Sequence, residues 1–464
     1  MPTRILWFRR DLRLHDHPAL AAALEPGDGT AVVPLFVVDP RLVGAPRMGA
    51  PRLSYLCDAL AALDEGLHRR GGRLIVRSGD PRDVVPAVAA ETGAAAVHWS
   101  GEFTPYGTDR DAAVRAALEG AGVEAHAHPG VLLAEPGSVR TASGDFFRVF
   151  SPFQRAWREV PLGEVTPAPG RVPVPHATPG EPLPTPASLG VSLDADVIEG
   201  GEPAARARLE EFLRLSADMY HERRNLLSSD GTSRLSADLH YGCVSPRAVY
   251  RRLDLRQPGH KGFASELVWR DFYGHVLARW PEVAITEFNP ALRDLPWRGA
   301  SADLDAWCEG RTGYPVIDAA MRQLLGIAWM HNRARMLVAS FLCKDLLTDW
   351  RLGEAHFLRH LVDGDAASNN GGWQWAAGTG TDAQPYFRIF NPVSQGEQFD
   401  PDGAYVRRWV PELRRVPDRW IHHPWDLPDD IAADCGVRIG RDYPAPIVDH
   451  AQARIHALAF FKRA

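Results

Sequence analysis

Residues 363–375 read DGDAASNNGGWQW, and no other stretch of this length says as much about the chain. Two carboxylates stand close together, and a pair of asparagines, a pair of glycines and two tryptophans follow. Glycine lets the backbone approach a ligand closely, asparagine offers donors and acceptors, and tryptophan offers a flat surface for stacking. Core packing in a helix–loop–helix joint would explain any one of these residues. The whole string, continued by TGTDAQPYFRIFNP at residues 379–392, predicts a pocket for a flat heterocycle with polar edges.

Four further motifs precede this segment. They are ILWFRRDLRLHD (residues 5–16), GTSRLS (231–236), ELVWRDFY (266–273) and WMHNRARM (329–336). By these matches, which extend over nearly the whole chain, the sequence resembles the DNA photolyase/cryptochrome family. It is most similar to the bacterial class I cyclobutane pyrimidine dimer photolyases. The resemblance implies an α/β amino-terminal domain and an all-α carboxyl-terminal domain that binds FAD.

The composition is that of an ordinary globular protein, with 45% apolar and 24% charged residues among 464. A chain of this length is expected to hold two or more cores. The net charge of −6 argues against indiscriminate nucleic-acid binding, so a DNA-binding face would have to be a local basic patch. No apolar run approaches the roughly 20 residues of a membrane span. Charged residues interrupt the first apolar run, so no signal peptide is expected.

The five cysteines are scattered, without metal-ligand spacing or a disulfide pattern. We therefore predict no metal site and no iron–sulfur cluster, and the cysteine usage suits a reducing cytosol. A cytoplasmic bacterial protein that acts on chromosomal DNA is the expectation.

Residues 1–130 alternate short apolar runs with helical stretches, which predicts a parallel, Rossmann-like sheet with helices on both faces. The predicted strands are Arg4–Phe8, Gly29–Val38, Arg73–Val76 and Ala95–Trp99, and the predicted helices are Pro51–Arg70 and Asp80–Thr92. No Gly-x-Gly-x-x-Gly follows the first strand, so the sequence does not support dinucleotide binding there.

Residues 131–204 are interpreted as a connector, in which 161–190 holds nine prolines. Proline cannot donate a backbone hydrogen bond, so this part is expected to run extended over the surface. A disordered linker is the alternative for its middle. From 205 to 464 the periodicity is helical. Val268, Phe272, Val276 and Trp280 form one apolar stripe, and residues 315–350 predict two or three helices.

The resemblance assigns an FAD site to the helical domain. GTSRLS would bind the FAD phosphates at a helix start, with Thr232 or Ser233 as N-cap. The implied FAD-binding residues are Tyr220, Thr232, Ser233, Arg234, Leu235, Ser236, Trp269, Arg270, Tyr273, Arg335, Asp363, Asp365 and Asn369.

Around the flavin ring, the resemblance implies that Arg335 pairs with Asp363 and that Asp365 accepts from the isoalloxazine edge. Asn369 matches the residue that faces flavin N5, where many cryptochromes carry Asp or Cys. Trp329, Asn332 and Met336 are spaced to share one helix face, either as a core stripe or as a cavity wall.

The implied lesion pocket consists of Glu266, Trp269, Asn332, Met336 and Trp375, with Arg333 as a further DNA-binding residue. Tryptophan faces would pack a pyrimidine dimer, and Glu or Asn would contact its edges after it flips from the duplex. Glu266, Asn332, Met336, Asn369 and Trp375 are the predicted catalytic set. Phosphate contacts are expected among Arg223, Arg224, Arg333, Arg388, Arg407 and Arg408, although each also suits an ordinary surface arginine. The (6-4) photolyases carry a histidine pair where this chain has Asn332 and Met336, and His331 alone does not reproduce it.

Three tryptophans match the family's electron-transfer chain from flavin to surface: Trp373, Trp350 and Trp297. Each alone is compatible with core packing.

Phe36, Asp39 and Arg52 match antenna-lining positions, and EFTPYGTDRD at 102–111 resembles deazaflavin-binding relatives more than folate-using ones. We predict 8-hydroxy-5-deazaflavin as a second chromophore, with methenyltetrahydrofolate, a flavin or an empty site as alternatives. A strand-end turn with a surface arginine would also explain these residues.

The sequence therefore predicts light-driven repair of cyclobutane pyrimidine dimers by electron transfer from excited, reduced FAD. The expected partner is DNA that contains pyrimidine dimers, with the protein acting as a monomer without an obligate protein partner. A cryptochrome photoreceptor, a (6-4) photolyase and a flavoprotein oxidoreductase are the alternatives. Asn369, the lesion-pocket residues and the lack of a long tail beyond Ala464 count against a cryptochrome.

Overall fold

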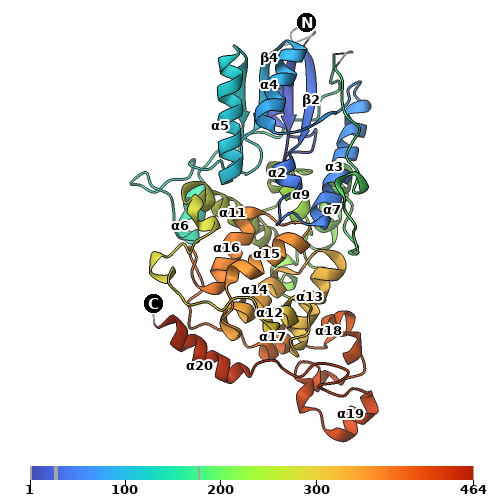
Figure 1. The fold of residues 1–464 in the computed structure, drawn as a ribbon, viewed down its shortest axis with the longest axis vertical. Coiled ribbons are helices and arrows are strands. Elements are labelled where there is room, and N and C mark those ends of the chain that lie inside the picture. Colours follow the sequence, from blue (N-terminus) through green and yellow to red (C-terminus); the bar gives the residue numbers. More distant parts are fainter. Residues whose placement is uncertain (1–2, 26–29, 176–177, 463–464) are drawn as a thin grey trace.

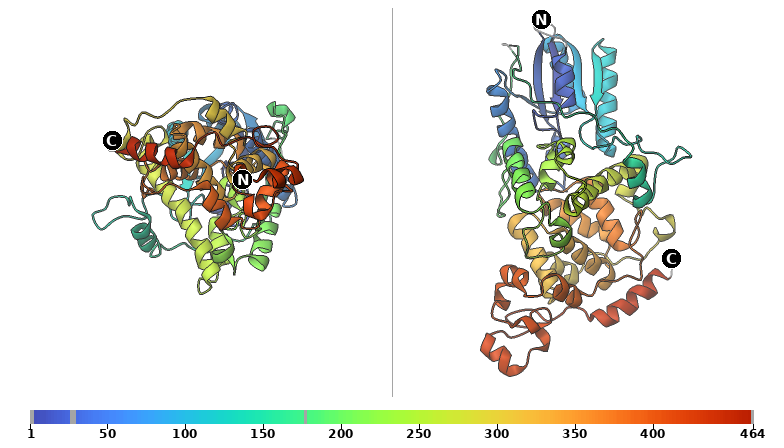
Figure 2. Two further views of the ribbon diagram at one scale, coloured as in Figure 1. Left: turned by 90° about the horizontal axis from the view of Figure 1, so that it is seen from below. Right: turned by 180° about the vertical axis from the view of Figure 1, so that it is seen from behind.

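A computed structural model describes residues 3–25, 30–175 and 178–462. The α/β domain forms one end of an elongated molecule and the helical domain forms the other (Figures 1 and 2). Five parallel strands form a sheet in the order β3-β2-β1-β4-β5. They are β1 (Thr3–Phe8), β2 (Ala31–Val38), β3 (Ile75–Ser78), β4 (Ala94–Ser100) and β5 (Glu124–His128).

Helices cover both faces of this sheet, as the alternation of strands and helices predicted. The helices of the domain are α1 (Pro18–Leu24), α2 (Pro40–Val43), α3 (Ala50–His68), α4 (Pro81–Thr92) and α5 (Pro105–Gly120). Leu6 and Phe8 of β1 pack with α1 and α3 in one buried cluster, whereas Ile5 and Trp7 pack with α4 and α5 in another. Successive strand residues point to opposite faces, so one strand supplies both cores.

Several predicted boundaries in this domain were wrong. The third strand begins at Ile75 rather than Arg73, and Gly29, the predicted start of the second strand, lies outside the described residues. The sequence interpretation also missed β5, α1 and α5. Strand β5 has the sequence EAHAH and lies at the edge of the described sheet, paired with β4, so it lacks the apolar run of a central strand.

The proline-rich part of the connector runs extended along the α/β domain. Its Pro173 carbonyl accepts from Val32 at 2.8 Å, and Glu181 donates to the Val76 carbonyl at 2.9 Å. Between residues 161 and 190 the described part contains one short helical turn, Ala187–Leu189. The domain boundaries at 130 and 204 stay a prediction.

The remainder of the chain is helical in every described element. The helices are α6 (Phe150–Trp157), α7 (Glu202–Leu215), α8 (Tyr220–Arg223), α9 (Ser236–Tyr241), α10 (Pro246–Arg251), α11 (Pro258–Arg279), α12 (Ala302–Cys308), α13 (Pro315–Ile327), α14 (Asn332–Ser340), α15 (Trp350–His360), α16 (Ala366–Ala377), α17 (Pro392–Phe399), α18 (Ala404–Trp409), α19 (Asp429–Cys435) and α20 (His450–Phe461). A π-helical turn, Phe341–Asp345, extends α14.

Helix α11 connects the core to the cavity described below. Val268, Phe272 and Val276 are buried against α6, and Trp280 packs against the same cluster just after the helix ends. The opposite side of α11 lies against α16. Gly371 of α16 allows this contact, because a Cβ atom there would stand 2.1 Å from the ring of Tyr273.

Candidate functional site

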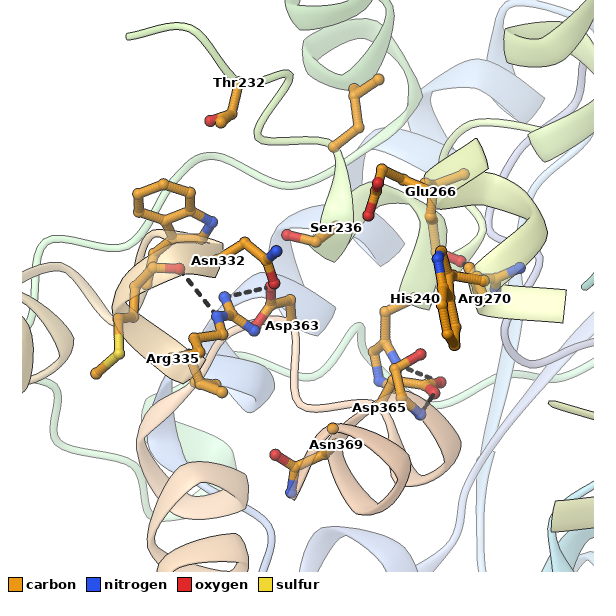
Figure 3. A pocket seen from close by; sticks show the side chains of 18 of the residues that line it. Thr232, Ser236, His240, Glu266, Arg270, Asn332, Arg335, Asp363, Asp365 and Asn369 are labelled. Atoms are coloured by element: carbon orange, nitrogen blue, oxygen red, sulfur yellow. Dashed lines mark hydrogen bonds and ion pairs between the residues drawn. The ribbon is translucent and has the colours of Figure 1, made fainter. Parts of the chain in front are cut away.

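A cavity of about 500 Å³ lies in the helical domain, between α9, α11, α14 and α16 (Figure 3). Its lining includes every predicted FAD-binding residue: Tyr220, Thr232, Ser233, Arg234, Leu235, Ser236, Trp269, Arg270, Tyr273, Arg335, Asp363, Asp365 and Asn369. The predicted lesion-pocket residues Glu266, Asn332, Met336 and Trp375 line the same cavity, as does Trp373. The structure therefore brings together residues from motifs that are far apart in the sequence.

Hydroxyl groups gather at one side of the cavity, on the segment that leads into α9. The predicted N-cap at Thr232 or Ser233 was wrong, because α9 begins at Ser236 and its N-cap position is Leu235. Arg234 has a positive φ of 53°, which turns the chain before the helix starts. Ser233 instead accepts from the Leu235 amide at 3.3 Å. Thr232, Ser233 and Ser236 nonetheless line the cavity, where their hydroxyls are available to a phosphate.

An ion pair forms part of another wall. Arg335 Nη2 donates to Asp363 Oδ2 at 2.8 Å, and Arg335 Nε donates to the Met330 carbonyl at 2.9 Å. The second Asp363 oxygen, Oδ1, is buried without a hydrogen-bond partner among the described residues. The Arg335–Asp363 pair therefore places a charged, hydrogen-bonded group at the wall of the cavity.

Asp365 caps the start of α16 and also binds an arginine of the α/β domain. Its Oδ1 accepts from the amides of Ala367 at 3.1 Å and Ser368 at 2.9 Å, which makes it the N-cap. Its Oδ2 accepts from Arg10 Nη2 at 2.5 Å, and His240 Nδ1 lies 3.4 Å away. Burial alone would raise the pKa of Asp365, but Arg10 and the hydrogen bond with His240 hold it well below its usual range.

Sequence reasoning missed Arg10 and His240 as parts of the site. Arg10 follows β1 in the α/β domain, and its Nε also donates to the His240 carbonyl at 3.1 Å. Burial and the neighbouring Arg10 lower the pKa of His240 to about 4, so its imidazole is neutral at pH 7. Arg10 did not stand out, because its proximity to Asp365 depends on how the two domains dock. His240 did not stand out, because it is 125 positions from Asp365 in the sequence.

Aromatic rings form the wall on α11. Trp269 stacks on Phe150 with ring centroids 3.7 Å apart, and Tyr273 lies 5.5 Å from Trp269. Gly372, which also lines the cavity, has open space where a Cβ atom would be. A flat ring can therefore lie against α16 without meeting a side chain at this position.

Glu266 carries a paired carboxylate at the cavity. Arg224 Nη1 donates to Glu266 Oε1 at 2.6 Å, and Arg224 also lines the cavity. Burial raises the pKa of Glu266 above its ordinary value, although Arg224 opposes the shift. Asn332 is exposed at the first position of α14, where its amide faces both the cavity and the solvent.

The predicted helical face of Trp329, Asn332 and Met336 was wrong in one respect. Helix α13 ends where Ala328 adopts a positive φ of 52°, and α14 begins only at Asn332. Trp329 therefore precedes the helix, although all three residues line the cavity.

The arginines proposed for DNA differ in their surroundings. Arg333 does not line the cavity, and its Nη2 donates to Asn225 Oδ1 at 2.7 Å. Arg407 pairs with Asp418 at 2.6 Å. Arg223, Arg388 and Arg408 have exposed side chains, which are available to contact phosphate.

The three predicted electron-transfer tryptophans belong to one apolar cluster. Trp373 lines the cavity and packs on Gly353 of α15, where a Cβ atom would stand 2.1 Å from its ring. Trp350 is the fully buried first residue of α15, and Trp297 is partly buried at the edge of the cluster. Their order from cavity to surface agrees with a chain, and their role in electron transfer stays a prediction.

The predicted antenna residues differ in their contacts, and their role stays a prediction. Phe36 packs in the core of the α/β domain. Asp39 caps α2 and accepts from the Tyr106 hydroxyl. Arg52 is buried and donates to the carbonyls of Leu358 at 2.8 Å and Gly364 at 3.3 Å in the helical domain. The alternative of a surface arginine was therefore wrong, and Arg52 joins the two domains.

Among residues 3–25, 30–175 and 178–462, no three His, Cys, Asp or Glu side chains lie close enough together to hold a metal ion. No helix within these ranges is both long and apolar enough to span a bilayer.

Comparison with known proteins gives matches over the whole chain. Residues 4–175 match the family described as DNA photolyase, and residues 263–463 match the FAD binding domain of DNA photolyase. A deoxyribodipyrimidine photo-lyase of Streptomyces griseus is 45% identical over 468 residues, which cover 100% of this chain and 99% of that protein. The corresponding protein of Escherichia coli K12 is 41% identical over 480 residues, with 100% and 99% covered.

Solved structures with this fold include photolyases and a cryptochrome. A bacterial class III photolyase from Agrobacterium tumefaciens has a TM-score of 0.92 and 38% identity, covering 100% of this chain and 98% of that one. A Synechocystis sp. PCC6803 cryptochrome has a TM-score of 0.91 and 32% identity, with 99% of both chains covered. An archaeal photolyase from Sulfolobus tokodaii with two FAD molecules has a TM-score of 0.86 and 32% identity, with 100% of both chains covered.

Proposed function

The chain belongs to the DNA photolyase family, and from this premise we propose that it is a deoxyribodipyrimidine photo-lyase. It repairs cyclobutane pyrimidine dimers in DNA by light-driven electron transfer from excited, reduced FAD. The observation that carries the proposal is that the FAD-binding residues and the lesion-pocket residues line one cavity.

The residues of the cavity fit FAD. The Arg335–Asp363 ion pair lines one wall, Gly372 leaves room beside α16, and Thr232, Ser233 and Ser236 supply hydroxyls for phosphate. Arg335 keeps Asp363 in place. The Asn369 side chain, whose amide donates to the Glu354 carbonyl at 3.2 Å, also lines the cavity. Bound FAD supplies the light-excited electron donor, while the protein binds and orients it.

The lesion would enter beside Glu266, Asn332 and Trp375. Tryptophan faces pack the apolar edge of a pyrimidine dimer, and Glu266 and Asn332 hydrogen-bond its amide groups. Flipping the damaged bases from the duplex costs a few kcal/mol, and less where the lesion has already weakened stacking. Arg223, Arg388 and Arg408 are proposed to hold the flanking phosphates.

Two observations favour a cyclobutane dimer as substrate and repair as the activity. His331 is buried, caps α14 through the Arg333 amide at 3.1 Å and does not line the cavity, so it cannot act as half of a histidine pair on the lesion. Asn369 supplies a neutral amide where many cryptochromes carry Asp or Cys.

The deciding experiment uses protein with fully reduced FAD and a DNA oligonucleotide that contains one thymine dimer. We expect the dimer to be converted to two thymines under light and not in the dark, with no repair of a (6-4) lesion. Absence of repair in the light would remove the enzyme assignment and favour a cryptochrome photoreceptor. As a matched pair, Met336→Ala should lower repair without loss of FAD, whereas Arg69→Ala, an exposed change directly after α3, should leave both unchanged.

For the α/β domain we propose a second chromophore, 8-hydroxy-5-deazaflavin. Phe36 lies in the carboxyl-terminal half of β2 and Asp39 directly follows the strand, at the end where parallel sheets bind ligands. Tyr106 belongs to the PYG segment that resembles deazaflavin-binding relatives. The archaeal relative with two FAD molecules makes FAD the first alternative to test. Reconstitution with deazaflavin, methenyltetrahydrofolate and FAD in parallel separates these outcomes. Stoichiometric binding of either alternative in place of deazaflavin would refute the assignment.

We further propose that the protein acts as a monomer on chromosomal DNA in the bacterial cytoplasm. Light scattering of the protein alone and with dimer-containing DNA tests the monomer, and a mass of twice the chain would contradict it.

A further inference from the structure

Glu287 connects the two outer tryptophans of the proposed electron-transfer chain. Its side chain is buried, and one oxygen, Oε1, accepts from Trp350 Nε1 and from Trp297 Nε1, each at 3.2 Å. The other oxygen, Oε2, accepts from Arg351 Nη2 at 2.6 Å. A single carboxylate therefore contacts the polar edge of both indoles.

The surrounding backbone holds this arrangement in place. The segment after Trp297 pairs with the segment before Trp350 through a parallel bridge between Arg298 and Thr348. Arg351 Nε also donates to the Ile285 carbonyl at 2.8 Å, and Arg293 Nε donates to the Glu287 carbonyl at 3.1 Å. Arg351 thus binds the backbone two residues before Glu287, and Arg293 binds the backbone of Glu287 itself.

Glu287 carries a negative charge at neutral pH. Burial alone would raise its pKa, but the hydrogen bonds from Arg351 and Trp350 lower it below the ordinary value. The charged groups that face it are Arg351 and Arg293, with Asp349 behind Arg351 at 3.1 Å.

The inner tryptophan has no such partner. Trp373 Nε1 is buried without a hydrogen-bond acceptor among the described residues. A positive charge on Trp373 therefore has no carboxylate of the described chain hydrogen-bonded to its indole N–H. A positive charge on Trp350 or Trp297 lies against a carboxylate, which stabilises it.

Arg351 makes this carboxylate necessary. Its guanidinium carbon lies 4.7 Å from the centre of the Trp350 ring. Without Glu287, this cation would oppose the oxidation of Trp350. With Glu287, the two charges offset each other beside the ring.

We propose that Glu287 is the counter-ion of the tryptophan chain and makes outward movement of the positive charge favourable. The inference rests on the proposed function, because bound FAD, when oxidised and excited by light, would supply the acceptor for one electron from Trp373. One electron then moves from Trp350 to Trp373, and one from Trp297 to Trp350. Each step restores the inner indole and leaves the outer one positively charged, and no bond is broken. Glu287 acts as a positioning residue, because it contacts the tryptophans rather than FAD.

The test compares Glu287→Gln with Glu282→Gln in protein that contains oxidised FAD. Glutamine keeps an acceptor oxygen but removes the charge, and Glu282 is an exposed glutamate in the same segment. Blue light is applied with an external reductant, and flavin photoreduction and the lifetime of the tryptophan radical are recorded. We expect Glu287→Gln to lower the flavin photoreduction and the radical lifetime by roughly tenfold or more each. The interaction energy of two unit charges at contact distance exceeds the roughly 1.4 kcal/mol that corresponds to a tenfold change. Glu282→Gln should match the wild type, and FAD content should be equal in all three.

A pH profile of the wild type supplies a second measurement that does not depend on the variant folding. Photoreduction should decline on acidification as Glu287 is protonated, and the same decline should be absent in Glu287→Gln. If Glu287→Gln shows the same photoreduction as the wild type while Trp350→Phe blocks it, the inference about Glu287 is wrong and the tryptophan chain still stands. Full photoreduction in Trp350→Phe would contradict both the counter-ion role of Glu287 and the tryptophan chain. The proposed repair activity would still stand, because it is measured separately with chemically reduced enzyme.

Discussion

Arg10→Gln is expected to weaken FAD binding although Arg10 belongs to the α/β domain. Arg10 donates to Asp365 Oδ2 at 2.5 Å, and Asp365 lines the cavity. The substitution keeps a polar side chain of similar length but removes the charge. It leaves His240, at 3.4 Å, as the nearest remaining partner of that oxygen.

The size of the effect follows from the burial of the pair. The two side chains are 16% and 10% exposed. Removal of one partner from a buried pair costs about 3–5 kcal/mol. Asp365 keeps the amides of Ala367 and Ser368 at the start of α16, so we expect a smaller loss of about 2 kcal/mol. When part or all of this free energy is lost from FAD binding, the Kd for FAD rises by about 3-fold to 30-fold, because about 1.4 kcal/mol corresponds to a tenfold change in Kd.

The assay is FAD titration of the apoprotein, with Arg9→Gln as the matched control. Arg9 is also a buried arginine, but its guanidinium pairs with Asp111 and donates to the Ser100 carbonyl within the α/β domain. Both variants should lower stability, and only Arg10→Gln should raise the Kd for FAD. An unchanged Kd in Arg10→Gln, or an equal rise in Arg9→Gln, would refute the argument that Arg10 acts through Asp365.

Acid titration checks the same reasoning with a defined sign. The pKa of Asp365 is lower in the folded protein than in the unfolded chain, so its ionised form stabilises the fold above the unfolded value of about 3.9. That contribution is lost as the pH falls through the depressed pKa. Arg10→Gln raises the folded pKa, so FAD release on acidification should begin at a higher pH than in the wild type.

Three other substitutions test separate parts of the site. Trp350→Phe should block photoreduction of oxidised FAD and leave repair by chemically reduced enzyme nearly unchanged. Trp307→Phe, which changes another buried indole 6.0 Å from Trp373, should leave photoreduction intact, and the reverse result would assign the chain to Trp307. Asn369→Asp should change which flavin radical accumulates, because a carboxylate near N5 offers different charge and proton chemistry. An unaltered radical spectrum would mean that Asn369 does not face N5. Glu266→Gln should lower repair by about tenfold, the loss of one hydrogen bond to a charged group, measured as light-dependent turnover at saturating DNA. Equal turnover would show that Glu266 only holds Arg224.

The cavity residues were predictable because their motifs combine residue types that core packing does not require. A string such as DGDAASNNGGWQW places polar amides, glycines and tryptophans together, and the structure puts its Asp363, Asp365 and Asn369 at one cavity. The sheet was predictable because buried parallel strands are continuous apolar runs. Strand β5 and helix α5 were missed, because an edge strand and a helix rich in charge lack that signal.

The contacts that set the charges of the site were not predictable from local sequence. Arg10 and Asp365 are separated by 355 positions, and they meet only because the two domains dock. The role of Glu287 could not be predicted from local sequence. Its hydrogen bonds to Trp297 and Trp350 form where a parallel bridge brings the segments around Arg298 and Thr348 together. The break between α13 and α14 was missed for a local reason. The spacing of Trp329 and Asn332 fits a helix, but the positive φ of Ala328 ends that helix first.

The carboxylates of the site share one arrangement, and it bears on the charge that the cavity can hold. Four carboxylates each pair with one arginine from a different part of the chain, namely Asp363–Arg335, Asp365–Arg10, Glu266–Arg224 and Glu287–Arg351. Arg270 also lines the cavity, and its guanidinium donates to two carbonyls, those of Val131 at 2.6 Å and Leu239 at 2.9 Å. Three of these carboxylates, Asp363, Asp365 and Glu266, line the cavity and are already paired, whereas Arg270 forms no ion pair among the described residues and adds a positive charge to the cavity wall. An anionic, reduced flavin would therefore be attracted to the cavity rather than repelled, even though the whole chain carries a net charge of −6.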